Sequence, residues 1–380
     1  MHADPIPLCT GLIIFVASII SLRLGISVAI VEILLGSIAG NFGLRTEEWM
    51  QYLAGFGGII LTFLAGTEID TKLMKENLKS SVLIGGLSFL LPFVLVAVVA
   101  LFFLHWDVRA ALIAGIALST TSLAVVYSVL AESGLSDTRI GKMLMSATFI
   151  TDMGTALALS VIFVKPTWFT LLFYVVSTTV IVVAASSSHF LFNHSAFRNK
   201  VVESEIKYIF LLLLTLVYFA NLGEGHAVLP AFVLGLFMSK YFGKESEHHL
   251  VVIRLRTVAY AIITPVFFIV GGLRISFPLV AASLGLFVLF FFLKIIAKFL
   301  GVYFLAKKYI PQGSMYTTLL MSTGLTFGTI ASLFGLQSGI INQSQYSILV
   351  GVVVASAVIP TFIAQKWFMP VEDEDILEEE

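Results

Sequence analysis

Long apolar segments, separated by short polar stretches, recur from one end of this chain to the other. A helix of about 20 apolar residues is long enough to cross a bilayer. Because lipid does not tolerate unpaired backbone groups, the pattern predicts an all-α polytopic membrane protein. Thirteen transmembrane spans are expected, at residues 8–22, 27–41, 51–67, 80–104, 109–131, 140–164, 168–192, 205–221, 226–241, 257–272, 278–306, 314–336 and 345–367.

Two of these spans are interrupted by hydroxyl side chains and glycine. The cluster in the fifth span is Thr120, Thr121 and Ser122, and that in the twelfth is Ser322, Thr323, Gly324 and Thr326. Such clusters suit unwound backbone lining a cavity, although ordinary small-residue helix packing explains either one alone equally well. The two spans are seven apart, so they run in opposite directions. The pair predicts an inverted-topology repeat, with spans four to six matching eleven to thirteen and two crossed discontinuous helices.

Asp152 lies near the middle of the sixth span, one helix after the first cluster. A carboxylate at this depth costs about 3 kcal/mol or more unless it meets water or a partner. Such a group can exchange a proton for a cation when burial and neighbouring charge offset each other. Static pairing with a lysine or a helix end is the alternative. We expect Asp152 to bind the cation and the proton in turn.

Two lysines, Lys294 and Lys298, lie four residues apart in the eleventh span and share one helix face. The apolar stretch 280–293 is too short to span alone, so the helix carries at least Lys294 deep into the membrane. Lys298 could instead extend toward the cytoplasmic surface. Otherwise one lysine balances helix C-termini near the broken helices, or pairs with an acid. Glu32, in the second span, is expected to be structural.

Composition supports the membrane class. The chain is 58% hydrophobic and 12% charged, with a mean hydropathy of +1.01, which is about half the charge of a soluble protein. The net charge of -1 argues against nucleic acid as a partner, and the single cysteine excludes an intrachain disulfide and a cysteine zinc cluster. No cofactor and no cleavable signal peptide are expected, and membrane lipid is the surrounding partner.

Basic residues are distributed unevenly between the two sides of the predicted spans. With the N-terminus outside, sixteen of the 22 lysines and arginines fall in cytoplasmic segments and two lie within span eleven. The outer loops carry the other four, which are Arg45, Arg109, Lys165 and Arg274. The asymmetry follows the positive-inside rule and predicts a multi-pass plasma-membrane protein with a cytoplasmic C-terminus. The acidic stretch 371–380 is expected to be a solvated cytoplasmic tail.

Several segments resemble one known family. They are residues 32–40 (EILLGSIAG), 63–70 (FLAGTEID) and 265–274 (PVFFIVGGLR). Together with the two hydroxyl clusters and the Thr151–Asp152 pair, they resemble the transmembrane domain of the monovalent cation:proton antiporter-2 family of sodium/hydrogen exchangers. The resemblance covers nearly the whole chain. The closest subgroup is the spore-germination-type Na⁺/H⁺ and K⁺ antiporters, whose crossover and ion-site segments are similar to residues 119–134 and 151–160.

The resemblance implies roles for particular residues. Asp152 matches the family's ion-binding carboxylate, and Thr151 stands where electrogenic relatives have a second aspartate and many electroneutral ones have asparagine. Lys298 best matches the family's basic residue in span eleven, with Lys294 as the fallback. The remaining matches are the first crossover, Thr120, Thr121 and Ser122, and a position at which relatives offer a hydroxyl, Thr148.

The resemblance also implies a homodimer that works by elevator-like alternating access. Residues 1–79 and 193–277 would form a dimerisation domain. Residues 80–192, which hold the first repeat and a linking seventh span, would form a core domain with residues 278–370. Residues 1–79 also contain a glycine-rich helix face that suits a dimer contact, formed by Gly36, Gly40, Gly55 and Gly58.

The function expected from these features is exchange of Na⁺ for H⁺. Electroneutral exchange is favoured because position 151 is threonine, which leaves one carboxylate to release one proton per cation. A K⁺/H⁺ antiporter and a passive monovalent cation channel are the alternatives, and the sequence does not separate Na⁺ from K⁺. An enzyme is not expected. An intramembrane aspartyl protease needs two membrane aspartates, and a His-Glu-x-x-His metalloprotease helix is absent from the sequence.

Overall fold

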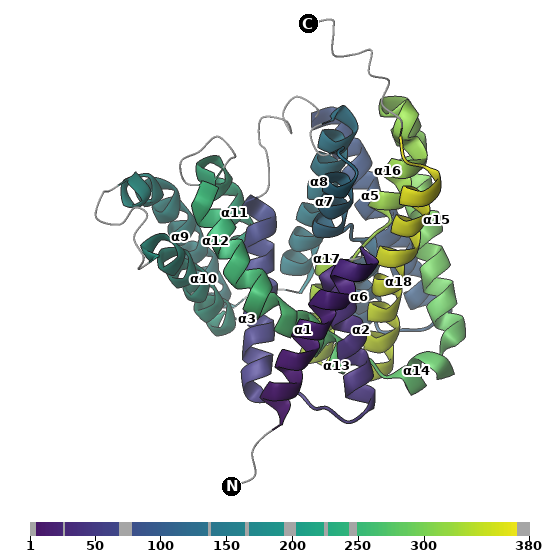
Figure 1. Cartoon of the computed structure of the whole chain (residues 1–380), viewed down its shortest axis with the longest axis horizontal. Helices are drawn as coiled ribbons and strands as arrows, with labels where there is room; N and C mark the ends of the chain where they lie inside the picture. The colour runs from purple at the N-terminus through teal and green to yellow at the C-terminus, as the bar shows by residue number, and fades with distance from the viewer. Residues whose placement is uncertain are drawn as a thin grey trace, which may run out of the picture.

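The computed structural model is all-helical over the residues it describes. These are residues 5–25, 27–67, 78–135, 138–163, 167–193, 203–223, 227–242 and 249–370. The expected acidic tail at 371–380 lies outside the described residues. In Figure 1, α1 (Ile6–Leu24) begins at the lower end of the molecule and α18 (Gln343–Trp367) ends at the upper end. That placement agrees with an odd number of crossings, while the side that faces the cytoplasm stays a prediction.

The first half of the chain contributes helices up to α9. They are α2 (Val28–Asn41), α3 (Glu48–Thr67), α5 (Leu78–Val98) continued by a π-helical turn η1 (Val99–Phe103), α6 (Val108–Ser119), α7 (Leu123–Glu132), α8 (Arg139–Ile162) and α9 (Trp168–Asn193). The ends follow local chemistry. Asp107 caps α6 by accepting a hydrogen bond from the Arg109 amide, and Thr138 caps α8 in the same way from Gly141.

The second half contributes α10 to α18. They are α10 (Ser204–Leu222), α11 (Val228–Phe242), α12 (His249–Val258), η2 (Ala259–Ile263), α13 (Thr264–Leu273), α14 (Phe277–Ala282), α15 (Leu284–Tyr309), η3 (Pro311–Gly313), α16 (Ser314–Met321), α17 (Thr326–Gln337) and α18. A capping box, in which Asn342 and Gln345 bond each other's backbone amides, starts α18.

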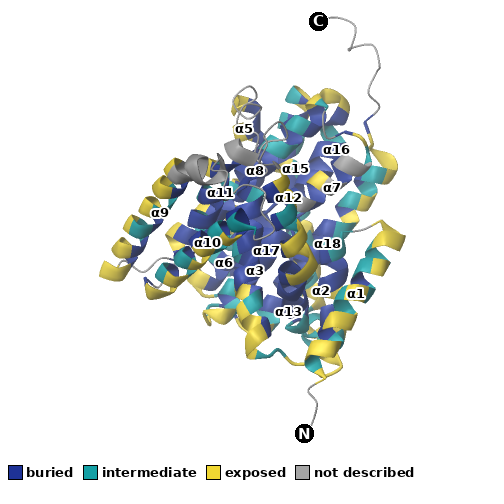
Figure 2. Ribbon diagram, turned by 60° about the vertical axis from the view of Figure 1, so that its left-hand side comes forward, coloured by how far each residue is buried: buried dark blue, intermediate teal, exposed yellow. Residues whose placement is uncertain are grey.

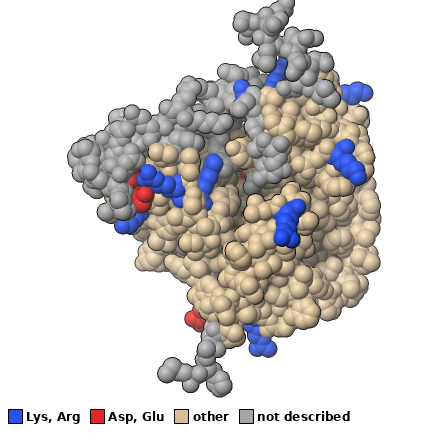
Figure 3. All heavy atoms as spheres, in the orientation of Figure 1, with Lys and Arg blue, Asp and Glu red and all other residues tan. Residues whose placement is uncertain are grey.

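The membrane class is confirmed by helix length and composition. Nine described helices are long and apolar enough to cross a membrane, and four shorter apolar helices accompany them: Val28–Asn41, Val108–Ser119, Trp168–Ala184 and Val228–Ser239. Together these helices fall at the positions of the expected spans, although the count of thirteen stays a prediction. On the face shown in Figure 3, most visible Lys and Arg side chains lie in the upper part and a broad uncharged area lies below them.

Two expected boundaries are wrong. The span expected at 257–272 belongs to a longer helical run from His249 to Leu273, because α12 begins with an amphipathic stretch that carries Arg254 and Arg256. The span expected at 278–306 is divided at Ser283, whose φ of -118° and ψ of 29° leave the helical region and separate α14 from α15.

Burial is arranged as expected for a protein surrounded by lipid. Large apolar side chains are exposed along α1, where Phe15 is 64% exposed, and the centre of the molecule around α17 is buried (Figure 2). Such a continuous apolar exterior would be unfavourable in water and is favourable against acyl chains. The buried polar side chains are therefore the features that need an explanation.

Glycines bring two pairs of helices into close contact. Gly36 and Gly40 of α2 abut the carbonyls of Ile269 and Leu273 on α13, and Gly66 of α3 abuts that of Phe232 on α11. A Cβ at any of these positions would collide with backbone. In the predicted numbering of thirteen spans, α2 and α11 are seven spans apart, as are α3 and α13, so a shift of seven exchanges one pair for the other. The two contacts fit the inverted repeat expected from the sequence, which stays a prediction.

The glycine face expected to serve a dimer is used within the chain. Gly36 and Gly40 face α13, and Gly58 lies against Phe267 and Ile330, whereas only Gly55 of the four has open space beside it. Three of the four glycines therefore do not support a dimer contact, because their positions are already filled. Dimerisation itself, like the division into a core and a dimerisation domain, stays a prediction.

Candidate functional site

The first hydroxyl cluster coincides with an interrupted helix. Helix α6 ends at Ser119 and α7 begins at Leu123, with Thr120 in an extended conformation at φ -64° and ψ 153°. The three intervening side chains are buried. Thr120 Oγ1 donates to the Ala117 carbonyl, and Ser122 Oγ accepts from the Val125 amide and so caps α7. The predicted unwinding is present. The hydroxyls of the interruption bond to nearby backbone groups, which in a continuous helix would bond to each other.

The second cluster also interrupts a helix. Helix α16 ends at Met321 and α17 begins at Thr326. Ser322 Oγ donates to the Thr318 carbonyl and Thr323 Oγ1 to the Leu320 carbonyl, so both hydroxyls bond back to their own helix. At this break the hydroxyls donate within their own helix, and the Met321 carbonyl provides a hydrogen-bond acceptor for the first break.

The two interruptions touch each other. Thr121 Oγ1 donates to the Met321 carbonyl at 2.8 Å, a contact between residues 200 positions apart. The backbones are so close that a Cβ at Gly324 would lie 2.5 Å from Thr120 Oγ1, and one at Gly328 would lie 2.8 Å from the Ala117 carbonyl oxygen. Only glycine fits at such an approach. Interrupted backbone from both predicted repeats is thus brought to one buried place.

Lys294 and Lys298 of α15 extend to the contact between the two interruptions, and both side chains are fully buried. Lys298 Nζ donates to Ser88 Oγ at 2.8 Å, to the Ser119 carbonyl at 2.6 Å and to Thr121 Oγ1 at 3.0 Å. An ammonium has three donors, so Lys298 is satisfied at all three. The bond to Ser119 places the positive charge at the C-terminal end of α6, where the helix dipole favours it. Extension of Lys298 to the membrane surface, the alternative considered from the sequence, is excluded.

Lys294 lies against the second interruption. Its Nζ donates to Ser356 Oγ on α18 at 2.8 Å, and a Cβ at Gly324 would lie 2.5 Å from the same nitrogen. The two lysines thus serve different interruptions, and one is not simply the substitute for the other.

Asp152 enters the site from α8. Its side chain is 2% exposed, and it lies within electrostatic reach of Lys298. Thr148, one turn earlier, donates to the Met321 sulfur at 3.4 Å, which places its hydroxyl at the second interruption. Thr151 instead donates to the carbonyls of Gly85 and Ala147, at 3.2 Å each, in the contact between α8 and α5. Its place among ion ligands therefore stays a prediction that the geometry does not favour.

Several residues of the site were missed from the sequence. Ser88 on α5 and Ser356 on α18 hold the two lysines, and the backbone of Met321 joins the two breaks. No sequence signal distinguishes these serines from the other hydroxyls of the apolar helices. Glu32 is buried on α2, which packs against α13, and its structural role stays a prediction.

The site combines hydroxyl and carbonyl oxygen atoms with a carboxylate and two lysines, and the surrounding helices are otherwise apolar. Hydroxyls and carbonyls at interrupted helices replace water around a monovalent cation, and a carboxylate supplies the negative charge that the cation or a proton neutralises. An ammonium at Lys298 is compatible with a carboxylate nearby, because each offsets the other's charge. The arrangement suits reversible binding of one small cation.

Comparisons with known proteins point to one group. A family model described as sodium/hydrogen exchanger, transmembrane, matches residues 11–368. The chain is 26% identical over 353 residues to probable Na⁺/H⁺ antiporter 3 of Methanocaldococcus jannaschii, covering 88% of each protein. It is 23% identical over 362 residues to the Na⁺/H⁺–K⁺ antiporter GerN of Bacillus cereus, covering 90% of this chain and 89% of GerN.

A solved structure has the same fold. The sodium proton antiporter MjNhaP1 from Methanocaldococcus jannaschii at pH 8 matches with a TM-score of 0.68 and 15% sequence identity. The match covers 96% of this chain and 99% of that one. At this identity the likeness concerns the arrangement of helices.

Proposed function

This chain belongs to the sodium/hydrogen exchanger transmembrane family, and from that premise we propose that it exchanges Na⁺ for H⁺ across a membrane. The family resemblance expected from residues 32–40, 63–70 and 265–274 is confirmed, and so is the closeness to the germination-type antiporters, through GerN. Exchange of Na⁺ for H⁺ is supported by the names of the two relatives, both of which are described as Na⁺/H⁺ antiporters.

The observation that carries the proposal is the buried Asp152 on α8, within electrostatic reach of Lys298, whose ammonium bonds Thr121 at the first interruption. A carboxylate there binds either a proton or a partly dehydrated cation, and binding of one excludes the other. That competition is the chemical requirement of an antiporter. A passive channel would instead need a continuous conducting path, usually lined by rings of carbonyls or charged side chains.

Electroneutral exchange of one cation for one proton is favoured by the surroundings of Lys298. All three donors of its ammonium have acceptors, in Ser88, Ser119 and Thr121. Loss of a proton would sacrifice one of these bonds, so the ammonium is suited to stay charged through the cycle. Asp152 then carries the only exchanged proton, since position 151 is threonine.

The movement that we propose is an elevator. A core domain of residues 80–192 and 278–370 would carry the site past a dimerisation domain of residues 1–79 and 193–277, within a plasma-membrane homodimer. The glycine-mediated contacts of α2 with α13 and of α3 with α11 lie inside the proposed dimerisation domain and suit a rigid support. The alternative substrate is K⁺, because the relative GerN is described as a Na⁺/H⁺–K⁺ antiporter. Hydroxyl and carbonyl oxygens accept either ion.

The first test of the function is Asp152→Asn. Amide in place of carboxylate keeps the volume and removes the titrating group, so exchange in proteoliposomes should fall at least about a hundredfold, as for loss of an essential charged group. Asp107→Asn is the matched control, because Asp107 caps α6 from an exposed position and asparagine caps a helix equally well. Exchange by Asp152→Asn at the rate of the control would refute the proposal.

The second test concerns stoichiometry and cation. Wild-type protein is reconstituted at zero pH gradient, and Na⁺ or K⁺ uptake is followed with an imposed membrane potential. Electroneutral exchange predicts no potential-driven accumulation of either ion, and saturable proton-coupled flux identifies the substrate. Accumulation abolished by Lys298→Gln, with cation/proton exchange at zero potential retained, would show that the lysine titrates. Flux that follows the potential in wild type and needs no proton gradient would instead indicate a channel.

A further inference from the structure

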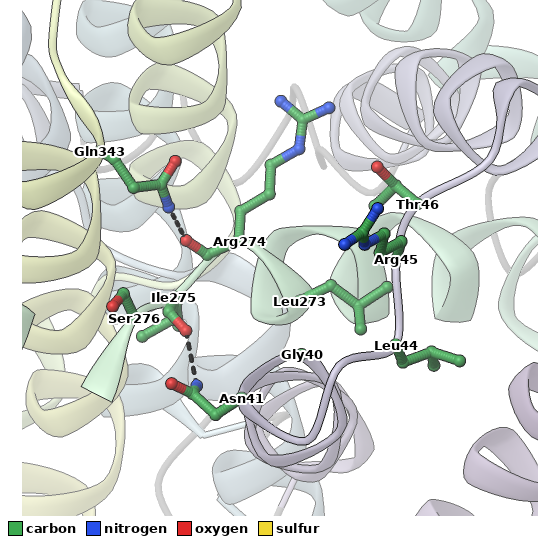
Figure 4. Close-up of a pocket in the computed structure, with 10 residues that line it drawn as sticks. All are labelled: Gly40, Asn41, Leu44, Arg45, Thr46, Leu273, Arg274, Ile275, Ser276 and Gln343. Carbon is green, nitrogen blue, oxygen red and sulfur yellow. Dashed lines mark hydrogen bonds between the residues drawn. The ribbon is translucent and has the colours of Figure 1, made fainter. Parts of the chain in front are cut away.

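A pocket of about 510 Å³ lies where α2, α13 and α18 meet, at the end of the molecule at which α2 finishes. Its polar lining includes Arg45 and Thr46 before α3, Arg274 after α13 and Gln343 at the start of α18. Figure 4 shows the Arg274 side chain extending upward from the segment after α13, with the Arg45 side chain to its right, before α3. These are two of the four basic residues that the sequence places on the outer face, so half of that charge gathers at one pocket.

The two arginines are available to a ligand. Within the described part of the chain, neither guanidinium takes part in a hydrogen bond or an ion pair. Glu47, close to Arg45 in sequence, instead accepts a hydrogen bond from Trp49 Nε1 at 2.6 Å. A guanidinium presents a planar fork of donors that matches phosphate oxygens, and two forks across a pocket suit one phosphate group.

We place the pocket near the level of lipid headgroups. Exposed Trp and Tyr side chains follow Arg45 in the first turns of α3, with Trp49 36% exposed and Tyr52 65% exposed. Trp and Tyr concentrate at the membrane–water interface, which supports this placement. Leu34 and Ile38, two turns and one turn before the end of α2, are also exposed and share a helix face with Asn41 of the pocket. They provide apolar surface along which acyl chains can lie.

We propose that this pocket binds the phosphate of an anionic phospholipid, with Arg45 and Arg274 as its cationic ligands and the exposed side of α2 as the seat of its acyl chains. A free phosphate would use the same arginines but would leave the apolar side chains of α2 without a role. The apolar surface below the charged pocket therefore favours the lipid.

A headgroup in this place would join segments that already contact each other. Asn41 donates to the Ile275 carbonyl at 2.8 Å, and Gln343 donates to the Arg274 carbonyl. If the elevator proposed above is correct, Arg45 and Arg274 belong to the dimerisation domain and Gln343 to the core. The lipid would then stabilise the arrangement of the two domains seen here, which makes the pocket a regulatory site. Binding itself does not depend on that function.

The test uses the full chain, delipidated in mild detergent and given equal amounts of phosphatidylglycerol and phosphatidylcholine. Retained lipid is counted by native mass spectrometry. Wild type should retain phosphatidylglycerol preferentially, and the double variant Arg45→Gln/Arg274→Gln should retain about tenfold less, because each basic residue contributes to attraction of an anionic headgroup. Arg109→Gln is the matched control, since Arg109 is an exposed basic residue of the same predicted face outside the pocket.

Equal retention by the double variant and wild type would overturn the proposal. Complete displacement of the lipid by an equal concentration of inorganic phosphate would also overturn it, because the pocket would then be a small-anion site. Should the double variant not fold, Arg45→Lys/Arg274→Lys keeps the charge and loses the forked geometry, and it should retain an intermediate amount. The wild-type comparison of the two lipids needs no variant, and absence of a preference there would refute the proposal on its own.

Discussion

The two helix interruptions resemble each other in sequence and differ in structure. At the first, between α6 and α7, Thr121 and the Ser119 carbonyl hold the ammonium of Lys298. At the second, between α16 and α17, the hydroxyls of Ser322 and Thr323 bond to their own helix. Across the contact between the breaks, the first thus contributes the hydroxyl of Thr121 and the second the backbone carbonyl of Met321. Similar hydroxyl clusters in two repeats therefore do not imply similar roles.

This difference follows from the way the breaks pack. The backbone of the second break approaches the first so closely at Gly324 and Gly328 that no side chain fits there. The first break lies beside α5 and α15, which supply Ser88 and Lys298. The first break therefore bonds side chains of two neighbouring helices, whereas the second contributes the close backbone contact.

The largest effect that would test this asymmetry is expected from Lys298→Met. The substitution leaves the Ser119 carbonyl buried without its donor, at a cost of about 1–3 kcal/mol, and removes the positive charge at the end of α6, worth up to about 2 kcal/mol more. Thermal stability in detergent and exchange in proteoliposomes should both fall strongly. Lys307→Gln, an exposed lysine of the same helix, is the control and should change neither. Unchanged stability in Lys298→Met would mean that the first break does not need the ammonium.

Gly324→Ala tests the backbone contact from the other side. A Cβ there would lie 2.5 Å from both Lys294 Nζ and Thr120 Oγ1. Forcing extra volume into such a contact costs about 1–3 kcal/mol, so thermal stability should fall and exchange should slow. Gly86→Ala on α5 is the matched control, because nothing lies within 4 Å of its added Cβ and alanine favours a helix. Equal effects of the two substitutions would contradict the proposed close contact of the breaks.

Much of the fold followed from hydropathy and spacing. The helical membrane class, both interruptions and the deep position of Lys294 and Lys298 were expected from the sequence, because the cost of polar groups in lipid restricts where they occur. Boundaries were less accurate where a helix continues into an amphipathic stretch, as α12 does. Hydropathy marks the apolar portion of a helix and not its end.

The partners inside the site could not be predicted, for a physical reason. Ser88 is 210 positions from Lys298 and Ser356 is 62 positions from Lys294, so tertiary packing alone brings them together. The position of Thr151 depends on packing in the same way. Its place beside Asp152 in sequence suggested an ion ligand, but successive residues of a helix point about 100° apart and its hydroxyl faces Gly85 on α5.

The smallest effect that distinguishes the two breaks is expected from a pair of matched substitutions, Thr121→Val and Thr323→Val. Valine keeps the shape of threonine, so each change removes only a hydroxyl. Thr121 donates to the Met321 carbonyl and accepts from Lys298, whereas Thr323 donates to the Leu320 carbonyl of its own helix. Loss of a bond to a charged group costs about 1.5–3 kcal/mol and loss of a neutral one about 1 kcal/mol. Thr121→Val should therefore be the less stable variant in a thermal melt and the slower exchanger. If the two variants melted and transported alike, the side chains of both breaks would be equivalent and the asymmetry argued here would be wrong.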